Sequence, residues 1–152
     1  MIDLNRIHHT GMIVEDIDAA QASLGQSMGL QWAPVRDFSP FPFWTPEQGL
    51  HEVNVKATYS IGAPHHFELV QGTGPFYDPH SAPDGRHIGV WTDDLPGEVE
   101  RLLSAGWHIV AAGAAPEDGY GPICYIAPPM PGLLVELIST VLKPIIDEWL
   151  GE

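Results

Sequence analysis

Two segments of the sequence resemble each other, and this internal repeat limits the possible folds more than any other feature. Residues 6–34 and 86–112 align at an offset of 78 positions, and each contains a short apolar run, an aspartate, an amphipathic stretch and a glycine. Self-similarity at so long a period indicates a duplicated structural unit. The coinciding pairs are His9 and His87, Gly11 and Gly89, and Asp16 and Asp94.

The two halves also end alike. The sequence HFELV at residues 66–70 resembles LVELI at residues 134–138, so that Glu68 and Glu136 each lie between apolar residues. Each half therefore opens with a histidine and closes with a glutamate, both on predicted strands. Two histidines and two carboxylates are a ligand set suited to one divalent metal ion.

Local patterns predict the same order of elements in both halves: a strand, a helix and three further strands. The first helix begins after Asp16 or Asp18 and runs to about residue 28, and the second begins after Asp93 or Asp94 and runs to about residue 105. Strands are expected at 7–14, 30–36, 51–61, 65–71, 86–92, 107–112, 122–127 and 133–139.

We expect a single domain over residues 1–152. Its parts are a first module at about 5–72, a linker at 73–85, a second module at about 86–139 and a tail helix at 140–152. Because side chains alternate along a strand, His8 is expected on the face opposite to His9.

Residues 37–50 differ from the rest of the repeat, with three prolines and four aromatic residues. This pattern favours a stiff apolar loop. One interpretation is a flap that covers the protein's own core; the other is a wall for an apolar substrate. The aromatic residues are Phe38, Phe41, Phe43 and Trp44.

Composition excludes several classes of partner. The chain of 152 residues is 44% hydrophobic, which suffices for one domain with a core, and its formal net charge of −14 opposes nucleic acid and anionic membranes. The single cysteine, Cys124, rules out an intramolecular disulfide bond. No signal peptide is visible, and the longest uncharged run, 119–135, contains four prolines, so we expect a cytoplasmic protein.

The paired glutamates are the strongest argument for a metal. Burying a carboxylate without a partner costs several kcal/mol, so Glu68 and Glu136 each need a cation or water. Related halves usually pack about a pseudo-twofold axis, which would bring His9 near His87 and the two glutamates near each other. The alternative is a duplicated fold that keeps this pattern without binding a metal.

Four stretches resemble the vicinal oxygen chelate superfamily, which includes glyoxalase I, methylmalonyl-CoA epimerase, extradiol dioxygenases and bleomycin-resistance proteins. They are HHTGMIVEDIDAA, HFELVQG, RHIGVWTDDL and GLLVELIS. The resemblance implies an α+β fold in which two paired βαβββ modules form a cup-shaped mixed sheet around a metal, with a C-terminal helix added. It also implies that His9, Glu68, His87 and Glu136 are the metal ligands. The sequence TGMIV fits the family's strand with His9, rather than His8, as the ligand.

The glyoxalase I and epimerase branches look nearest. The epimerase commonly has a glutamine at the first-half ligand position. This chain has Glu68 there, as glyoxalase I has a glutamate. Glu52 lies near the position of the epimerase's additional base, although its spacing is about one residue off. The basic residues are scattered along the sequence, whereas coenzyme A would favour a basic patch.

The resemblance implies proton transfer next to a carbonyl. One divalent ion (nickel, cobalt, zinc or manganese, with iron less favoured) would polarise an apolar carbonyl or thioester substrate, and Glu68 or Glu136 would move the proton. The reaction would be that of an isomerase, an epimerase or a lyase. Candidate substrate contacts are Phe43, Trp44, Glu52, Tyr59 and Tyr120.

Two other functions stay open. Extradiol dioxygenases of this superfamily hold iron with two histidines and one glutamate, and the additional acid Glu68 disfavours that reading. A non-catalytic protein that binds apolar small molecules is the other, although such relatives generally lack the metal ligands. The resemblance also implies a homodimer, with a small-molecule substrate as the partner.

Overall fold

The computed structural model describes residues 1–81 and 86–152. Its strands are β1 (Ile7–Ile13), β2 (Gln31–Trp32), β3 (Arg36–Asp37), β4 (Phe41–Thr45), β5 (Gly49–Val53), β6 (Val55–Ile61), β7 (His66–Gly72), β8 (His87–Thr92), β9 (His108–Ala112), β10 (Ile123–Ala127) and β11 (Val135–Ser139). Its α-helices are α1 (Ile17–Met28), α2 (Leu95–Ser104) and α3 (Lys143–Leu150), and its short 3-10 helices are η1 (Leu4–Arg6), η2 (Pro75–Tyr77), η3 (Pro116–Asp118) and η4 (Thr140–Leu142).

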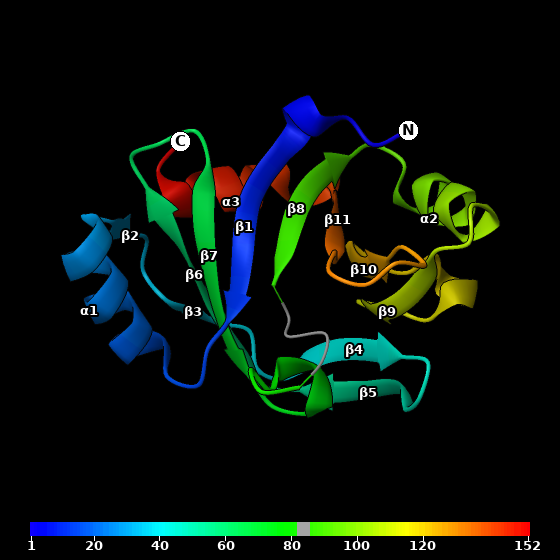
Figure 1. Cartoon of the computed structure of the whole chain (residues 1–152), viewed down its shortest axis with the longest axis horizontal. Helices are drawn as coiled ribbons and strands as arrows, with labels where there is room; N and C mark the ends of the chain where they lie inside the picture. The colour runs from blue at the N-terminus through cyan, green and yellow to red at the C-terminus, as the bar shows by residue number, and fades with distance from the viewer. Residues whose placement is uncertain (82–85) are drawn as a thin grey trace.

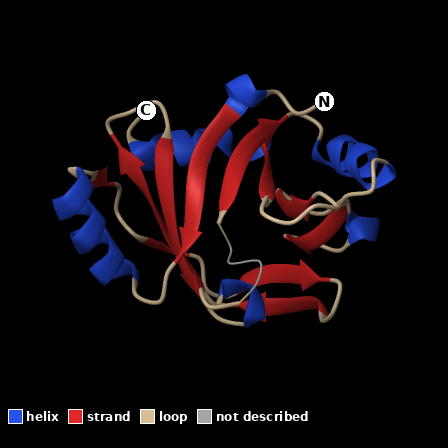
Figure 2. Cartoon of the chain, in the orientation of Figure 1, coloured by secondary structure: helices blue, strands red, loops and turns tan. Residues whose placement is uncertain are grey.

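The strands form one curled mixed sheet whose centre joins the two halves. Its order is β2-β6-β7-β1-β8-β11-β10-β9-β4-β5, and β3 also pairs with β6. Strand β1 is parallel to β7, β8 is parallel to β11, and β1 pairs with β8 in antiparallel fashion. Figures 1 and 2 show the resulting cup, with α1 and α2 on opposite flanks. The predicted α+β fold of two paired modules is confirmed.

The repeated aspartates begin the two flanking helices, as predicted. The side chain of Asp16 accepts a hydrogen bond from the amide of Ala19, and Asp94 accepts one from the amide of Gly97. Each cap satisfies an amide that the first helical turn leaves unpaired. No helix in the described part of the chain has the length and apolar character needed to cross a membrane.

The aromatic stretch 37–50 is not a loop, and this prediction was wrong. It contains strands β4 and β5, which pair with each other, and Trp44 of β4 pairs with Ala112 of β9 in the second half. Strands β4 and β9 share only this one register pair. Pro42, which cannot donate a backbone hydrogen bond, therefore does not disrupt the pairing of β4 with β9. The hairpin thereby carries part of the first half across to the edge of the second.

Several further boundaries differ from expectation. The predicted strand at 30–36 is two short strands, and the predicted strand at 51–61 is divided between β5 and β6. The predicted tail helix is η4 followed by α3. The predicted linker contains η2, and its residues 82–85 lie outside the described residues.

The tail helix α3 packs inside the curved sheet against the first module. The Trp149 side chain is buried, its ring lies 5.0 Å from that of Tyr59, and its indole N–H donates to the carbonyl of Pro34 at 2.7 Å. A second apolar cluster lies under α2 and includes Val99 and Leu102. The amphipathic faces of the helices therefore cover both modules.

Candidate metal centre

The four predicted ligands lie on four adjacent strands at the centre of the sheet. Glu68 is on β7, His9 on β1, His87 on β8 and Glu136 on β11, and these strands are neighbours in this order. The pseudo-symmetric pairing of β1 with β8 brings one histidine and one glutamate from each half to the same face. The structure thus brings together all four side chains that the sequence singled out.

The repeated glycines make room for the two histidine rings. In the sheet register His9 faces Gly89, and His87 faces Gly11. A Cβ atom on Gly11 would lie 2.2 Å from Nε2 of His87, and one on Gly89 would lie 2.1 Å from Cε1 of His9. Sequence analysis found that the glycines coincide but missed this role, which is visible only once the strands are paired.

The ligand atoms of the four side chains have the spacing of a metal site. Nε2 of His9 lies 3.2 Å from Nε2 of His87, 3.2 Å from Oε2 of Glu68 and 3.0 Å from Oε2 of Glu136. Nε2 of His87 lies 3.2 Å and 3.4 Å from the same two carboxylate oxygens. Bonds of about 2.0–2.2 Å to one ion would separate adjacent ligand atoms by roughly 3.0–3.5 Å. The residues therefore fit a divalent metal.

Burial makes this arrangement costly without a cation. His9 is fully buried, and the other three side chains are nearly so. The ion pairs that Glu68 and Glu136 make in the described part of the chain are with His9 and His87. Oε2 of Glu136 faces Nε2 of His9 at 3.0 Å and Nε2 of His87 at 3.4 Å, so it can accept a hydrogen bond only when one of these nitrogens carries a proton. A buried carboxylate oxygen without a donor or a cation beside it destabilises the fold.

The electrostatics of the cluster also favour positive charge. Burial alone would lower the pKa of His87, but the hydrogen bonds and charges of Glu136 and Glu68 raise it to about 10. Burial likewise acts to lower the pKa of His9, and Glu68 and Glu136 outweigh it and raise this pKa. Burial alone would raise the pKa of the two carboxyl groups, and the histidines lower it instead. A divalent ion would take the place of the protons that these imidazoles attract.

Neutral aromatic groups surround the ligands. The ring of Tyr59 lies 5.4 Å from that of His9, and the ring of Tyr125 lies 5.1 Å from that of His87. Burial raises the pKa of both phenols well above the usual value, so they stay protonated at neutral pH. Burial likewise lowers the pKa of His8 to about 3, so its ring is neutral.

His8 is not on the opposite face, contrary to the prediction from strand alternation. The register of β1 against β8 shifts between Ile7 and His9, which is a bulge at His8. A bulge interrupts the alternation and re-aims a side chain. Nδ1 of His8 consequently lies 3.0 Å from Nδ1 of His9. In the sequence, the only indication that both rings lie on one face is the pair of adjacent histidines, His8 and His9.

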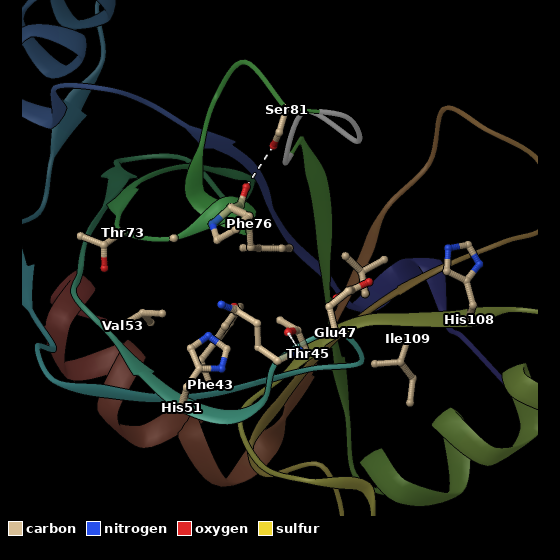
Figure 3. Close-up of a pocket in the computed structure, with 14 residues that line it drawn as sticks. Phe43, Thr45, Glu47, His51, Val53, Thr73, Phe76, Ser81, His108 and Ile109 are labelled. Atoms are coloured by element: carbon tan, nitrogen blue, oxygen red, sulfur yellow. Dashed lines mark hydrogen bonds between the residues drawn. The ribbon is translucent and has the colours of Figure 1, made fainter.

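A cavity of about 420 Å³ lies between the β4–β5 hairpin, β9 and the segment around η2. Figure 3 shows Phe43 and His51 on its hairpin side, Ile109 and His108 along β9, and Phe76 above them. The Phe76 ring lies 4.7 Å from that of Tyr125, which in turn contacts His87. Phe76 and Tyr125 therefore connect one wall of this cavity to the ligand cluster.

The five candidate substrate contacts lie in different places. Phe43 lines the cavity, and Tyr59 is buried beside His9. Trp44 packs with the second apolar cluster, and Glu52 is exposed on β5. The Tyr120 hydroxyl donates to Glu100 of α2. The packing of Phe76 against Tyr125 joins segments that are distant in the sequence, so the sequence did not predict a role for Phe76.

Comparison with known proteins gives the family. The model of the glyoxalase/bleomycin resistance protein/dioxygenase superfamily matches residues 8–125, which is most of the chain. The chain belongs to this superfamily. It has no match among curated protein sequences.

Solved structures share the fold of this superfamily member at low identity. Methylmalonyl-CoA epimerase from Streptomyces coelicolor, as a variant with 2-nitronate-propionyl-CoA, has a TM-score of 0.54 and 19% identity over 88% of this chain and 93% of that chain. The epimerase from Mycobacterium tuberculosis has a TM-score of 0.52 and 20% identity over 91% and 92%. A hypothetical protein from Bacillus halodurans has a TM-score of 0.55 and 16% identity over 88% and 92%.

Proposed function

We propose that this superfamily member is a divalent-metal-dependent enzyme of the glyoxalase and epimerase type, which moves a proton next to a carbonyl group. One observation carries the proposal: two histidines and two carboxylates are buried together with the spacing of a metal site. Such a set costs stability unless a cation binds there.

The residues that would hold the ion are His9, Glu68, His87 and Glu136. Mixed imidazole and carboxylate ligands suit zinc, nickel, cobalt or manganese. When bound, the ion supplies Lewis acidity that polarises a carbonyl and stabilises negative charge on its oxygen. The charges of two carboxylates and a divalent ion cancel, so the buried site is neutral overall.

A carboxylate of the set, Glu68 or Glu136, takes the proton from the carbon next to the carbonyl. The electron pair of the broken C–H bond moves toward the carbonyl oxygen, and the proton returns to the same carbon or a neighbouring one. Return to the other face of the same carbon is epimerisation, and return to a neighbouring carbon is isomerisation. Tyr59 and Tyr125, both buried and neutral, help to exclude water from the ligands.

The substrate we propose is an apolar carbonyl compound or thioester. The described residues that line the cavity include no lysine or arginine; the apolar ones include Phe43, Val53, Phe76, Ile109 and Val110, and the polar ones include Glu47, Gln48, His51 and His108. The apolar part of this lining favours an acyl chain or ring. The lack of cations gives no support for a phosphate-bearing carrier at this cavity.

Elemental analysis of the purified protein tests the metal. We expect about one equivalent of a divalent ion in the wild type and at least a tenfold lower content in His9→Ala and Glu136→Ala. The control is His80→Ala, because His80 is an exposed histidine that pairs with Glu15 away from the site. A folded wild type that binds no added divalent ion would refute the proposal and leave the apolar binding protein as the alternative.

Hydrogen–deuterium exchange at carbon tests the reaction without knowledge of the product. N-acetylcysteamine thioesters of branched acyl chains, with methylmalonyl-CoA as comparison, are incubated with the metal-loaded protein in D2O and followed by proton NMR. We expect exchange next to the carbonyl in the wild type, and a loss of about 10²–10⁴-fold in Glu136→Gln, as for removal of a general base. Glu15→Gln is the control. Oxygen consumption with iron alone would support the dioxygenase alternative.

A further inference from the structure

The bulge in β1 places a second histidine directly behind a metal ligand. Nε2 of His9 faces the carboxylates, and Nδ1 on the other side of the same ring lies 3.0 Å from Nδ1 of His8. The two rings meet edge to face, with centroids 5.2 Å apart and an interplanar angle of 89°. This contact joins two ring nitrogens, so one of them must donate and the other must accept.

Metal binding decides the direction of this hydrogen bond. A neutral imidazole carries one proton, and a histidine that binds a metal through Nε2 carries it on Nδ1. His9 must then donate, and Nδ1 of His8 must accept. The opposite direction would put the proton of a neutral His9 on Nε2, among the ligand atoms, where it would block the metal.

The ring of His8 makes no second hydrogen bond in the part of the chain that the structure describes. A neutral His8 that accepts through Nδ1 holds its own proton on Nε2, and in the described part of the chain Nε2 is buried without a hydrogen-bond partner. The ring is held on its other sides by aromatic contacts, with centroids 4.7 Å from His66, 5.3 Å from Tyr59 and 5.2 Å from Trp91. An unpaired buried N–H costs stability, which a purely structural aromatic residue at this position would avoid.

We propose that His8 is a positioning residue for the metal ligand His9: its Nδ1 accepts the ring N–H of His9 and so fixes the tautomer and the orientation that present Nε2 to the ion. The inference rests on the proposed metal site. Partners of this kind behind metal-binding histidines typically contribute about 10–100-fold to metal affinity.

Two substitutions separate this role from simple packing. His8→Phe keeps an aromatic ring among Tyr59, Trp91 and His66 but removes the acceptor. His8→Asn loses most of the ring but retains an amide oxygen at the same distance along the side chain as Nδ1. The control is His66→Phe, because His66 is also buried and touches His8, while its own Nδ1 bonds to the carbonyl of Ser60 at 2.6 Å.

The measurement is the dissociation constant for Co²⁺ alone, from visible absorbance titrations of the full chain, beside thermal unfolding of each metal-free variant. We expect His8→Phe to weaken binding about 10–100-fold, and His8→Asn and His66→Phe to stay within about threefold of the wild type. Proton NMR of the Co²⁺ form adds a readout, since the shifted ring N–H signal of His9 exchanges faster with water in His8→Phe.

The outcomes distinguish the inference from the proposed function. Wild-type binding with unchanged affinity in His8→Phe would overturn the role of His8 and leave the metal site intact. Weak binding in His8→Asn with normal binding in His8→Phe would show that the ring acts by packing, and would also overturn it. A folded wild type without Co²⁺ affinity would overturn both.

Discussion

At the scale of single residues, the site depends on two positions without side chains. Gly11 and Gly89 lie opposite the histidines, and the rings occupy the volume that a Cβ atom would fill. Neither glycine has the positive backbone φ that usually explains a glycine. Their function is therefore spatial, and it is local to the ligand cluster.

Gly89→Ala should displace the ring of His9. The added methyl group would lie 2.1 Å from Cε1 of that ring. We expect a destabilisation of about 1–3 kcal/mol in urea unfolding, as for overpacking of a core, and at least a tenfold drop in Co²⁺ affinity. The control is Gly25→Ala in α1, where the nearest contact of the new methyl would be the carbonyl of Leu30 at 3.2 Å. Normal Co²⁺ affinity in Gly89→Ala would contradict this account.

At the scale of elements, the tail helix α3 supports the site from inside the sheet. Tyr59 lies between Trp149 of α3 and His9, with ring centroids 5.0 Å and 5.4 Å away. The guanidinium of Arg36 on β3 lies over the Trp149 ring, 5.0 Å from its centroid. One aromatic residue thus links the last element of the chain to the first strand.

Trp149→Ala should remove the main anchor of α3. It would leave a large cavity beside Tyr59 and an unpaired carbonyl at Pro34. Comparable truncations cost about 3–5 kcal/mol, which urea unfolding would detect. Ile145 lies on the same helix with half of its surface exposed, so Ile145→Ala should cost much less. Equal losses in the two variants would show that α3 is not anchored by Trp149.

The elements show how far the sequence could be interpreted. The helices and their aspartate caps, the strands of the repeat and the four convergent side chains were all predictable, because each depends on local periodicity or on the duplication. The strands of the hairpin were not, since β4 is stabilised by pairing with β5 and by the distant residue Ala112. The orientation of His8 was missed for a similar reason, because a bulge depends on the partner strand.

At the scale of the whole molecule, the candidate site ties the two modules together. Each module supplies one histidine and one glutamate, and the ligands come from strands β7, β1, β8 and β11 across the seam. A ligand that binds only the folded chain stabilises it in proportion to its concentration. We therefore expect metal binding to raise the free energy of unfolding of the whole chain.

Removal of the metal should lower the thermal midpoint. Free metal at 100 times its dissociation constant contributes about 2.7 kcal/mol, or roughly 5–10 °C for a chain of this size. The sign of the pH dependence follows from the raised pKa of His9 and His87. Binding releases their protons, so affinity rises with pH, and the metal-induced shift should be smaller at pH 5.5 than at pH 7.5. Differential scanning calorimetry with and without metal measures both, and a larger shift at the lower pH would contradict the assignment.

On each of the paired strands β1 and β8, a glycine leaves room for the histidine of the other strand. This arrangement limits how the two halves of a duplicated chain can change during evolution. Gly89 in one half accommodates His9 of the other, and Gly11 accommodates His87. A larger residue at either glycine would therefore displace the histidine ring of the other half. The copies differ at their periphery, since among the described residues the β4–β5 hairpin belongs to the first copy alone. Where β1 and β8 pair, a change in one copy requires a matching change in the other.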